Sequence, residues 1–179
     1  MLVTTASHNH WSAALRSEAL VGFLREATCH SRQALGHVSD QAVAWQPFAH
    51  GHSISAMLLH VADQESLVVE EVILGGVRSE IMLELFGSDL STVERGAWPK
   101  PMSESLEWHY SIQDAVRGRT EDVLTEEDPT RLVHHPKWGE ITIATAVLHL
   151  VQHEAYHAGQ MALHKLHYGW GGVEPEMAA

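Results

Sequence analysis

Apolar residues recur at three- and four-residue steps in four long segments, and this spacing is typical of amphipathic helices. The predicted helices span residues 11–38, 54–73, 102–124 and 143–168. Ser53 and Thr142 stand directly before the second and the last helix, where a hydroxyl group can cap the helix N-terminus. Runs with β-like character are too short to build a sheet, so we expect none. The sequence therefore predicts an all-α fold in which four long helices form a bundle.

The size and composition of the chain fit one such domain. Its 179 residues are about the length of a single compact domain, taken here as residues 1–179. A hydrophobic content of 45% with 19% charged residues indicates a packed interior and argues against disorder. Two parts lack helical periodicity. One is a less regular insertion at about residues 76–102, between the second and third helices, and the other is a tail at about 169–179, which we expect to be flexible.

The charge of the chain argues against several classes of partner. There are 11 Lys and Arg residues against 23 Asp and Glu, which gives a formal net charge of −12. This balance disfavours nucleic acids and anionic membrane surfaces, because both are bound through basic residues. No apolar run is long enough to span a bilayer, and the first residues, MLVTTASHNHW, lack the features of a signal peptide. We therefore expect a cytoplasmic protein.

Histidine is the residue type that points most clearly to chemistry. The chain has 15 histidines, whereas its one cysteine, Cys29, excludes an intrachain disulfide and a cysteine-based zinc site. His153 and His157 are four residues apart on the last predicted helix, so their rings share one face. Leu150 and Met161 lie on the same face, which should point into the bundle. Two imidazoles there favour a metal site, because burying both rings without partners is costly.

A third ligand has to come from another helix. His149 continues the four-residue spacing, but it lies about 12 Å from His157 along a straight helix, too far to share one ion. His60, in the middle of the second predicted helix, is the best candidate. Spacing alone leaves two interpretations of His60 open, a metal ligand or a residue at the edge of the apolar face.

The segment from His153 to His157 also matches the His-Glu-x-x-His motif of zinc peptidases, in which the glutamate is the general base. The longer form of that motif requires histidine at position 163 and glycine at position 160. This chain has Leu163 and Gln160 there, and no edge strand is predicted that would hold a peptide. A protease is therefore disfavoured.

Two segments of the sequence resemble the DinB/YfiT-like superfamily, a damage-inducible family distinct from the DNA polymerase that shares the name. They are GHSISAMLLHVADQES, with its mid-helix His60, and ITIATAVLHLVQHEAYHAGQMALHKLHYG, with its His-x-Gly-Gln element. The resemblance covers most of the chain. It implies a four-helix bundle, often dimeric, in which three histidines hold a divalent metal in an open site. By motif match these ligands are His60, His153 and His157.

The resemblance also implies a range of activities. Members of the superfamily include thiol-dependent transferases and isomerases, and many proteins described only as metal-dependent hydrolases. We expect a metal-dependent enzyme of the thiol S-transferase or hydrolase type, whose ion activates a bound thiol or water. Zn or Ni is the expected ion, and Fe, Mn and Cu are also compatible. The alternative is a non-enzymatic, stress-associated dimer with a structural or sensory metal, so whether the chain is an enzyme stays open.

Glu154 is the candidate catalytic residue, because it lies on the same broad face as the two histidines. It is suited to act as a general base or to support the ligands. The alternative is a carboxylate that is paired at a helix packing seam. Gln160 and Tyr156 are weaker candidates for the same supporting roles. We expect no cofactor other than the metal.

The last predicted helix has a second apolar face, which predicts a homodimer. This face consists of Leu148, Ala155, Gly159, Ala162 and Leu166. The small residues in it would allow a second helix to approach closely. The expected partners are thus a second copy of the chain and a small-molecule substrate, with a low-molecular-weight thiol as one candidate. Trp45, Trp98 and Trp138 fall in connecting segments, where each either pins its loop to the core or walls a cleft.

Overall fold

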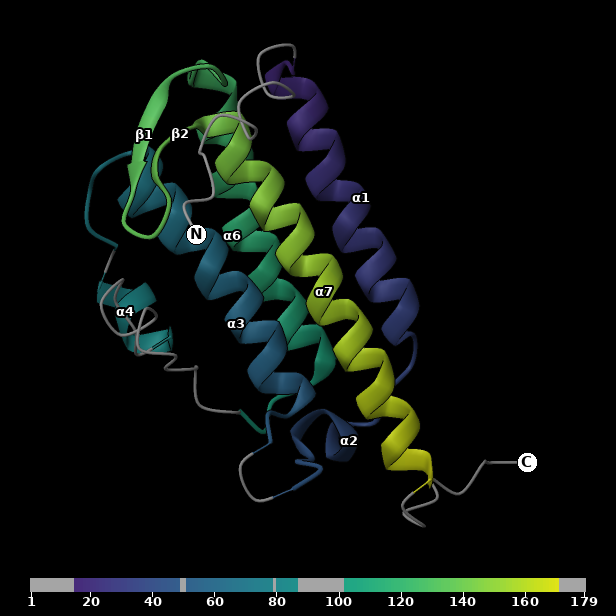
Figure 1. Ribbon diagram of the computed structural model, residues 1–179. Helices are drawn as coiled ribbons and strands as arrows, with labels where there is room; N and C mark the ends of the chain where they lie inside the picture. The colour runs from purple at the N-terminus through teal and green to yellow at the C-terminus, as the bar shows by residue number, and fades with distance from the viewer. Residues whose placement is uncertain (1–14, 49–50, 79, 87–101, 171–179) are drawn as a thin grey trace, which may run out of the picture.

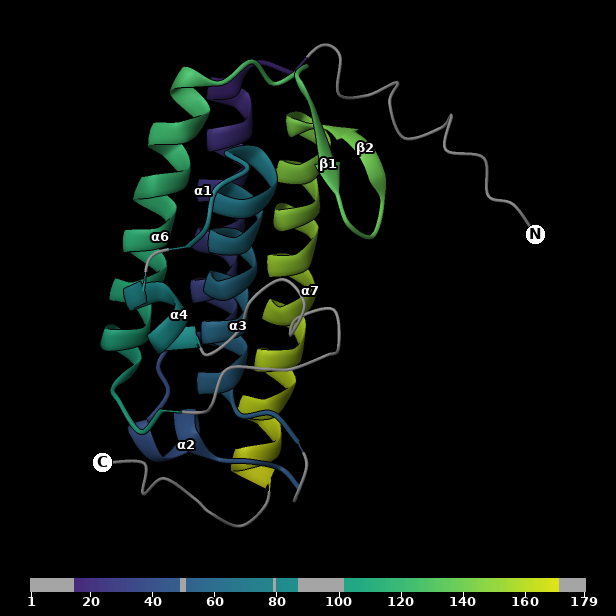
Figure 2. The same cartoon turned by 90° about the vertical axis from the view of Figure 1, so that its left-hand side faces the viewer.

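The computed structural model describes residues 15–48, 51–78, 80–86 and 102–170 of the chain. These residues are mostly helical, which confirms the predicted all-α class. The helices are α1 (Ser17–Leu35), α2 (Asp40–Ala44), α3 (Ile54–Leu67), α4 (Glu80–Phe86), α6 (Leu106–Glu126) and α7 (Ile143–Trp170). A π-helical segment, η3 (Val68–Ile73), continues α3. The four long helices lie side by side (Figures 1 and 2), with α1 packed against α7, and α3 against both α6 and α7.

The predicted N-terminal caps of two helices are present. The Ser53 hydroxyl accepts a hydrogen bond from the backbone N–H of Ala56 at 3.1 Å, at the start of α3. The Thr142 hydroxyl accepts one from the N–H of Thr145 at 3.2 Å, at the start of α7. Each bond satisfies a donor that the first helical turn leaves unpaired.

The expectation that no sheet forms was wrong. Strands β1 (Leu132–His135) and β2 (Gly139–Thr142) make an antiparallel hairpin, with Val133 opposite Ile141 and His135 opposite Gly139. Val133 and Ile141 are buried in the main hydrophobic cluster. Each strand has four residues, too few for an alternating pattern to stand out in the sequence. The hairpin joins α6 to α7, and it contacts η3 through β1 and α7 through β2.

Helix α3 is the central element of the fold. Almost every residue in it is buried, since it contacts α2, α4, α6 and α7. The hairpin contacts both the end of α3, through η3, and the start of α7, so these two helices run in opposite directions. Polar side chains in the middle of α3 therefore lie inside the protein and need partners there.

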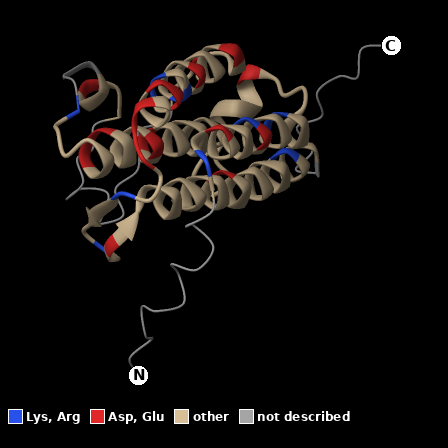
Figure 3. Cartoon of the chain, turned by 90° about the horizontal axis from the view of Figure 1, so that it is seen from above, with Lys and Arg blue, Asp and Glu red and all other residues tan. Residues whose placement is uncertain are grey.

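The predicted less regular insertion contains the short helix α4, whose Phe86 is buried against Leu59, Ala62 and Val116. The rest of that insertion from residue 87 to 101, with Trp98, and the tail from residue 171 onward lie outside the described residues. In the part of the chain that the structure describes, Asp and Glu residues are more frequent than Lys and Arg residues (Figure 3). Helix α7 differs in this respect, since it has one acidic residue, Glu154, and one Lys or Arg residue, Lys165.

Candidate metal centre

The fold brings together three histidines from two helices. His60 lies in the middle of α3, and His153 and His157 lie one turn apart on α7. The Nε2 atom of His153 is 3.2 Å from Nε2 of His60 and 3.1 Å from Nε2 of His157. One nitrogen atom from each ring lies within 4.8 Å of the other two. His60 and His157 are buried, at 8% and 4% exposed, and His153 is half-buried.

This spacing fits a shared metal ion. Two nitrogen atoms that bind one ion at about 2.0–2.1 Å, with an angle of about 90–109° at the ion, lie about 2.8–3.4 Å apart. Both measured Nε2 separations fall in that range. The three rings meet roughly edge to face, with interplanar angles from 63° to 89°. Nε2 of His153 lies close to Nε2 of both other rings, so the nitrogen atoms face one another. The histidines are therefore close enough, and suitably oriented, to hold a metal ion.

The three rings are also in the protonation state that a ligand requires. Burial, helped by the neighbouring rings, lowers the pKa of His60 to about 3 and that of His153 to about 4. Burial is also the main cause that lowers the pKa of His157. All three imidazoles are therefore neutral at pH 7, with lone pairs available to a cation.

Gln160 fixes the tautomer of His157. The side-chain carbonyl oxygen of Gln160 lies 2.6 Å from Nδ1 of His157, and because a carbonyl can only accept, Nδ1 carries the proton. Nε2 is then left with its lone pair on the side of His60 and His153. The amide nitrogen of Gln160 in turn donates to the Tyr156 hydroxyl at 3.0 Å. These contacts are compatible with the supporting role that the sequence suggested for Gln160 and Tyr156, and that role stays a prediction.

Replacing Gln160 by leucine should weaken metal binding about 10- to 100-fold, because the His157 ring loses the bond that holds its tautomer and orientation. Titration of the metal against a competing chelator measures the change. Gln152→Leu is the matched control, since Gln152 is an exposed glutamine on the same helix. Equal affinities of the two variants would show that the Gln160 bond has no part in holding the ligand.

The carboxylate of Glu154 lies in a buried ionic network. It is 3.0 Å from the Arg117 guanidinium and accepts a hydrogen bond from the Thr28 hydroxyl at 3.2 Å. Arg117 also makes a bidentate pair with Glu65 of α3, at 2.7 and 2.8 Å. Burial raises the pKa of Glu154, and Arg117 opposes that shift. These contacts favour the second interpretation of Glu154, a carboxylate paired at a helix seam, and its catalytic role stays a prediction.

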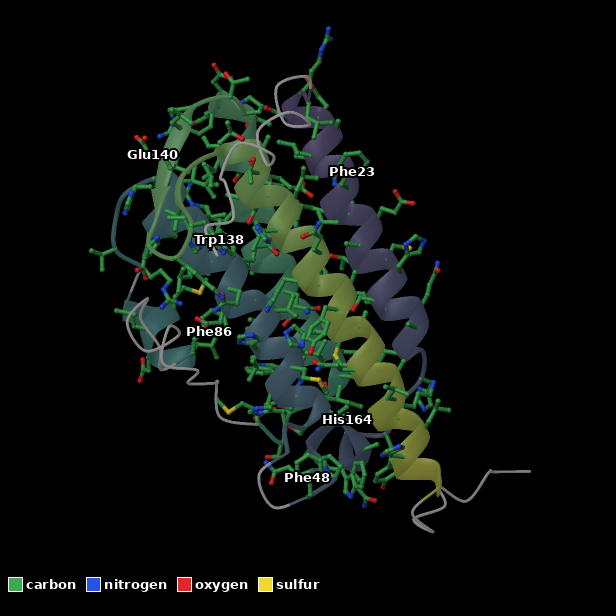
Figure 4. All side chains as sticks on the ribbon, viewed as in Figure 1. Phe23, Phe48, Phe86, Trp138, Glu140 and His164 are labelled. Atoms are coloured by element: carbon green, nitrogen blue, oxygen red, sulfur yellow. The ribbon has the colours of Figure 1, made fainter. Side chains whose placement is uncertain are left out.

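Trp138 pins the hairpin to the helix that carries two of the histidines. Its ring lies between those of His135 and His149, 3.8 Å from each centroid and within 17° and 12° of parallel. Figure 4 labels Trp138 at the hairpin, beside the long helices. His149 therefore belongs to this stack. It is not a member of the three-histidine cluster, as its spacing on the helix had predicted. Trp138 also lines a cavity of about 580 Å³ that reaches His60 and His153.

The sequence reasoning missed several residues around this centre. Arg117, Glu65 and Thr28 form the buried network, yet they come from three helices and share no local pattern. Gln64, which lines the cavity, was also missed. Gln64 is four residues after His60, so the spacing argument applied to α7 would have placed it on the same face of α3.

Fold and site together define a helical protein with a three-histidine arrangement suited to a metal ion. The family model of the DinB superfamily matches residues 24–161, which are 138 of the 179 residues. The chain belongs to this superfamily, as its sequence motifs had suggested. No curated protein matches the chain significantly. Within the described residues, no helix combines the length and apolar character needed to cross a membrane.

Proposed function

We propose that the chain binds one divalent transition-metal ion through His60, His153 and His157 and uses it to act on a small molecule. The observation that carries this proposal is the convergence of three neutral Nε2 atoms from two helices at metal-ligand spacing. Membership of the DinB superfamily supports it. Three nitrogen ligands leave at least one coordination position for a substrate or water.

A bound ion would supply a positive charge that makes a water molecule or a thiol more acidic, and so favours hydrolysis or thiol transfer. The protein's own residues hold and shield the site. Gln160 keeps the lone pair of His157 directed at the ligand position, and the hairpin forms part of the wall of the cavity that reaches His60 and His153. Imidazole ligands favour Zn or Ni, with Fe, Mn and Cu compatible.

In this proposal Glu154 helps to position the helix that carries His153 and His157, and it does not react with substrate. Its pairing with Arg117 and Thr28 holds α7 against α1 and α6. Glu154 is next to His153 in the chain, so these contacts hold the helix close to that ring. The catalytic alternative is tested by Glu154→Gln, which keeps the shape of the side chain. If Glu154 is the general base, this variant loses turnover but still binds the metal.

The proposal extends to the architecture and assembly of the chain. The four long helices would form the bundle of the DinB type, in one domain that spans residues 1–179. The second face of α7 would join two copies of the chain, since Ala155, Gly159 and Leu166 are exposed in the single chain. Light scattering at micromolar concentration tests the dimer, and a mass of one chain, 19.8 kDa, would contradict it.

The test of function compares an enzyme with the non-enzymatic alternative. Metal-loaded protein is assayed for turnover of a panel of thiols, esters and amides, and its helicity is followed by circular dichroism as the metal is chelated. Turnover that is lost on chelation and restored by the metal supports the proposal. No turnover, together with a loss of helicity on chelation, would assign the metal a structural role.

The buried histidines should make the metal-free protein sensitive to acid. His60 and His153 have pKa values of about 3 and 4 in the folded chain, below the ordinary value of 6.5. At a pH between the folded and the unfolded pKa values, the unfolded chain therefore binds more protons than the folded chain. Stability is fully present above about pH 6.5 and is lost as the pH falls, by about 1.4 kcal/mol per pH unit for each such histidine.

Urea denaturation at pH 7, 6 and 5 measures this loss. In the His60→Ala variant one of the two histidines is absent, so the fall in unfolding free energy should be less steep. The comparison removes the contribution of carboxylates, which both proteins share. The same pH slope in both proteins would contradict the account.

A further inference from the structure

The three-histidine cluster is reached from one side by a cavity of about 580 Å³, which lies between α3, α7 and the turn of the hairpin. His60 and His153 are in its wall. A larger cavity of about 710 Å³ lies near Trp45 and His164, and the described residues that line it include none of the three histidines. Of these two cavities, the one on the hairpin side therefore has histidines of the cluster in its wall.

Gln64 gives this cavity a group that can form hydrogen bonds. It follows His60 by one turn of α3 and lines the same cavity. Its amide nitrogen is buried, and it makes no hydrogen bond to any residue that the structure describes. A half-turn about the last side-chain bond exchanges the amide nitrogen and oxygen without changing the shape of the group. In the turned orientation the amide nitrogen takes the place of the oxygen, and Gln64 is then suited to donate to an oxygen atom of a ligand in the cavity.

Lys137 gives the cavity its charge. It lies in the hairpin turn and lines the cavity, and no carboxylate does so among the described residues. This is unusual in a chain with 23 acidic and 11 basic residues. The turn is held in place by the stacking of Trp138 on His149, and by the Lys137 backbone N–H, which donates to Nδ1 of His135 at 3.1 Å. The ammonium group therefore extends from a fixed backbone.

The rest of the wall consists of the stacked rings of His135, Trp138 and His149 and of aliphatic side chains. Leu67 and Val68, at the junction of α3 and η3, and Leu150 of α7 line the cavity beside the aromatic ring of Trp138. A cavity of this size, with an apolar wall and a few polar groups, is typical of small-molecule sites.

We propose that this cavity binds a small organic carboxylate with an apolar body. Gln64 donates to a carboxylate oxygen, Lys137 supplies the balancing charge, and Leu67, Val68 and Leu150 contact the apolar part. The inference rests on the proposed function in one respect, that the histidine end of the cavity holds the ion. Gln64 and Lys137 then determine specificity, and neither ligates the metal.

Binding of benzoate to the full chain tests the proposal, with benzyl alcohol as a probe that keeps the ring and lacks the carboxylate. Calorimetric titrations are made with metal-free and zinc-loaded protein. Benzoate should bind both forms, at least about tenfold more tightly than benzyl alcohol. Gln64→Leu should weaken benzoate binding about tenfold, because a hydrogen bond to a charged group is lost, and should leave benzyl alcohol within about twofold.

Two further variants keep the test decisive. Lys137→Met, in an exposed turn, should weaken benzoate binding about threefold or more at low salt and leave the fold unchanged. Gln41→Leu, at an exposed glutamine of α2, should change nothing. Equal benzoate affinity in Gln64→Leu and the unmodified chain, or no preference for benzoate over benzyl alcohol, would overturn the inference. Zinc stoichiometry, measured on the same samples, reports separately on the metal site, so either proposal can fail without the other.

Discussion

Replacing His60, His153 or His157 by alanine is expected to weaken zinc binding more than 100-fold in each case. This loss of affinity is larger than the roughly 10- to 100-fold loss expected when a residue that only supports a ligand is changed, because here a ligand itself is removed. The geometry makes the three sites equivalent in this respect, since each ring supplies one nitrogen to the cluster. Elemental analysis of protein purified without a histidine tag, with competition titrations, measures the change.

His167→Ala is the matched control for these variants. His167 is an exposed histidine of the same helix, α7, and lies outside the cluster. This variant should retain one metal ion per chain with unchanged affinity. If a cluster variant bound zinc as tightly as His167→Ala, the replaced histidine would not be a ligand.

The second large effect is expected on stability, from the buried Arg117, whose partner Glu154 is next to His153 in the chain. Arg117→Met should lower the free energy of unfolding by about 3–5 kcal/mol, because the buried carboxylates Glu65 and Glu154 lose their cationic partner. Their side chains are 5% and 3% exposed, so water cannot replace the guanidinium. Urea denaturation at pH 7 measures the loss.

Arg119→Met on the same helix is the control. Arg119 pairs with Glu70 at 2.9 Å, but its side chain is 53% exposed, so the pair is screened by solvent. Its removal should cost less than about 1 kcal/mol. Losses of similar size in the two variants would mean that the buried network does not stabilise the fold as described.

Helical periodicity was sufficient to predict that the long helices exist, since each extends over several turns and repeats its pattern. At the start of α3, Ser53 caps the helix as expected. The hairpin could not be predicted in the same way. Its four-residue strands are held by pairing with each other and by contacts with η3 and α7, which are distant in sequence.

The candidate site was predictable to different degrees. His153 and His157 follow from their spacing on one helix, whereas His60 needed the family resemblance, because spacing cannot bring two helices together. The structure does so, with His60 and His153 93 positions apart in sequence and 3.2 Å apart at Nε2. Arg117 and its partners could not be predicted, since the network depends on how α1, α3, α6 and α7 pack.

Anomalous diffraction from crystals of the zinc-loaded chain tests the central claim most directly. The account predicts one strong zinc peak between α3 and α7, with Nε2 of His60, His153 and His157 at about 2.0–2.1 Å. A zinc peak bound by other residues, with the ring of His60 turned away from the other two, would contradict it.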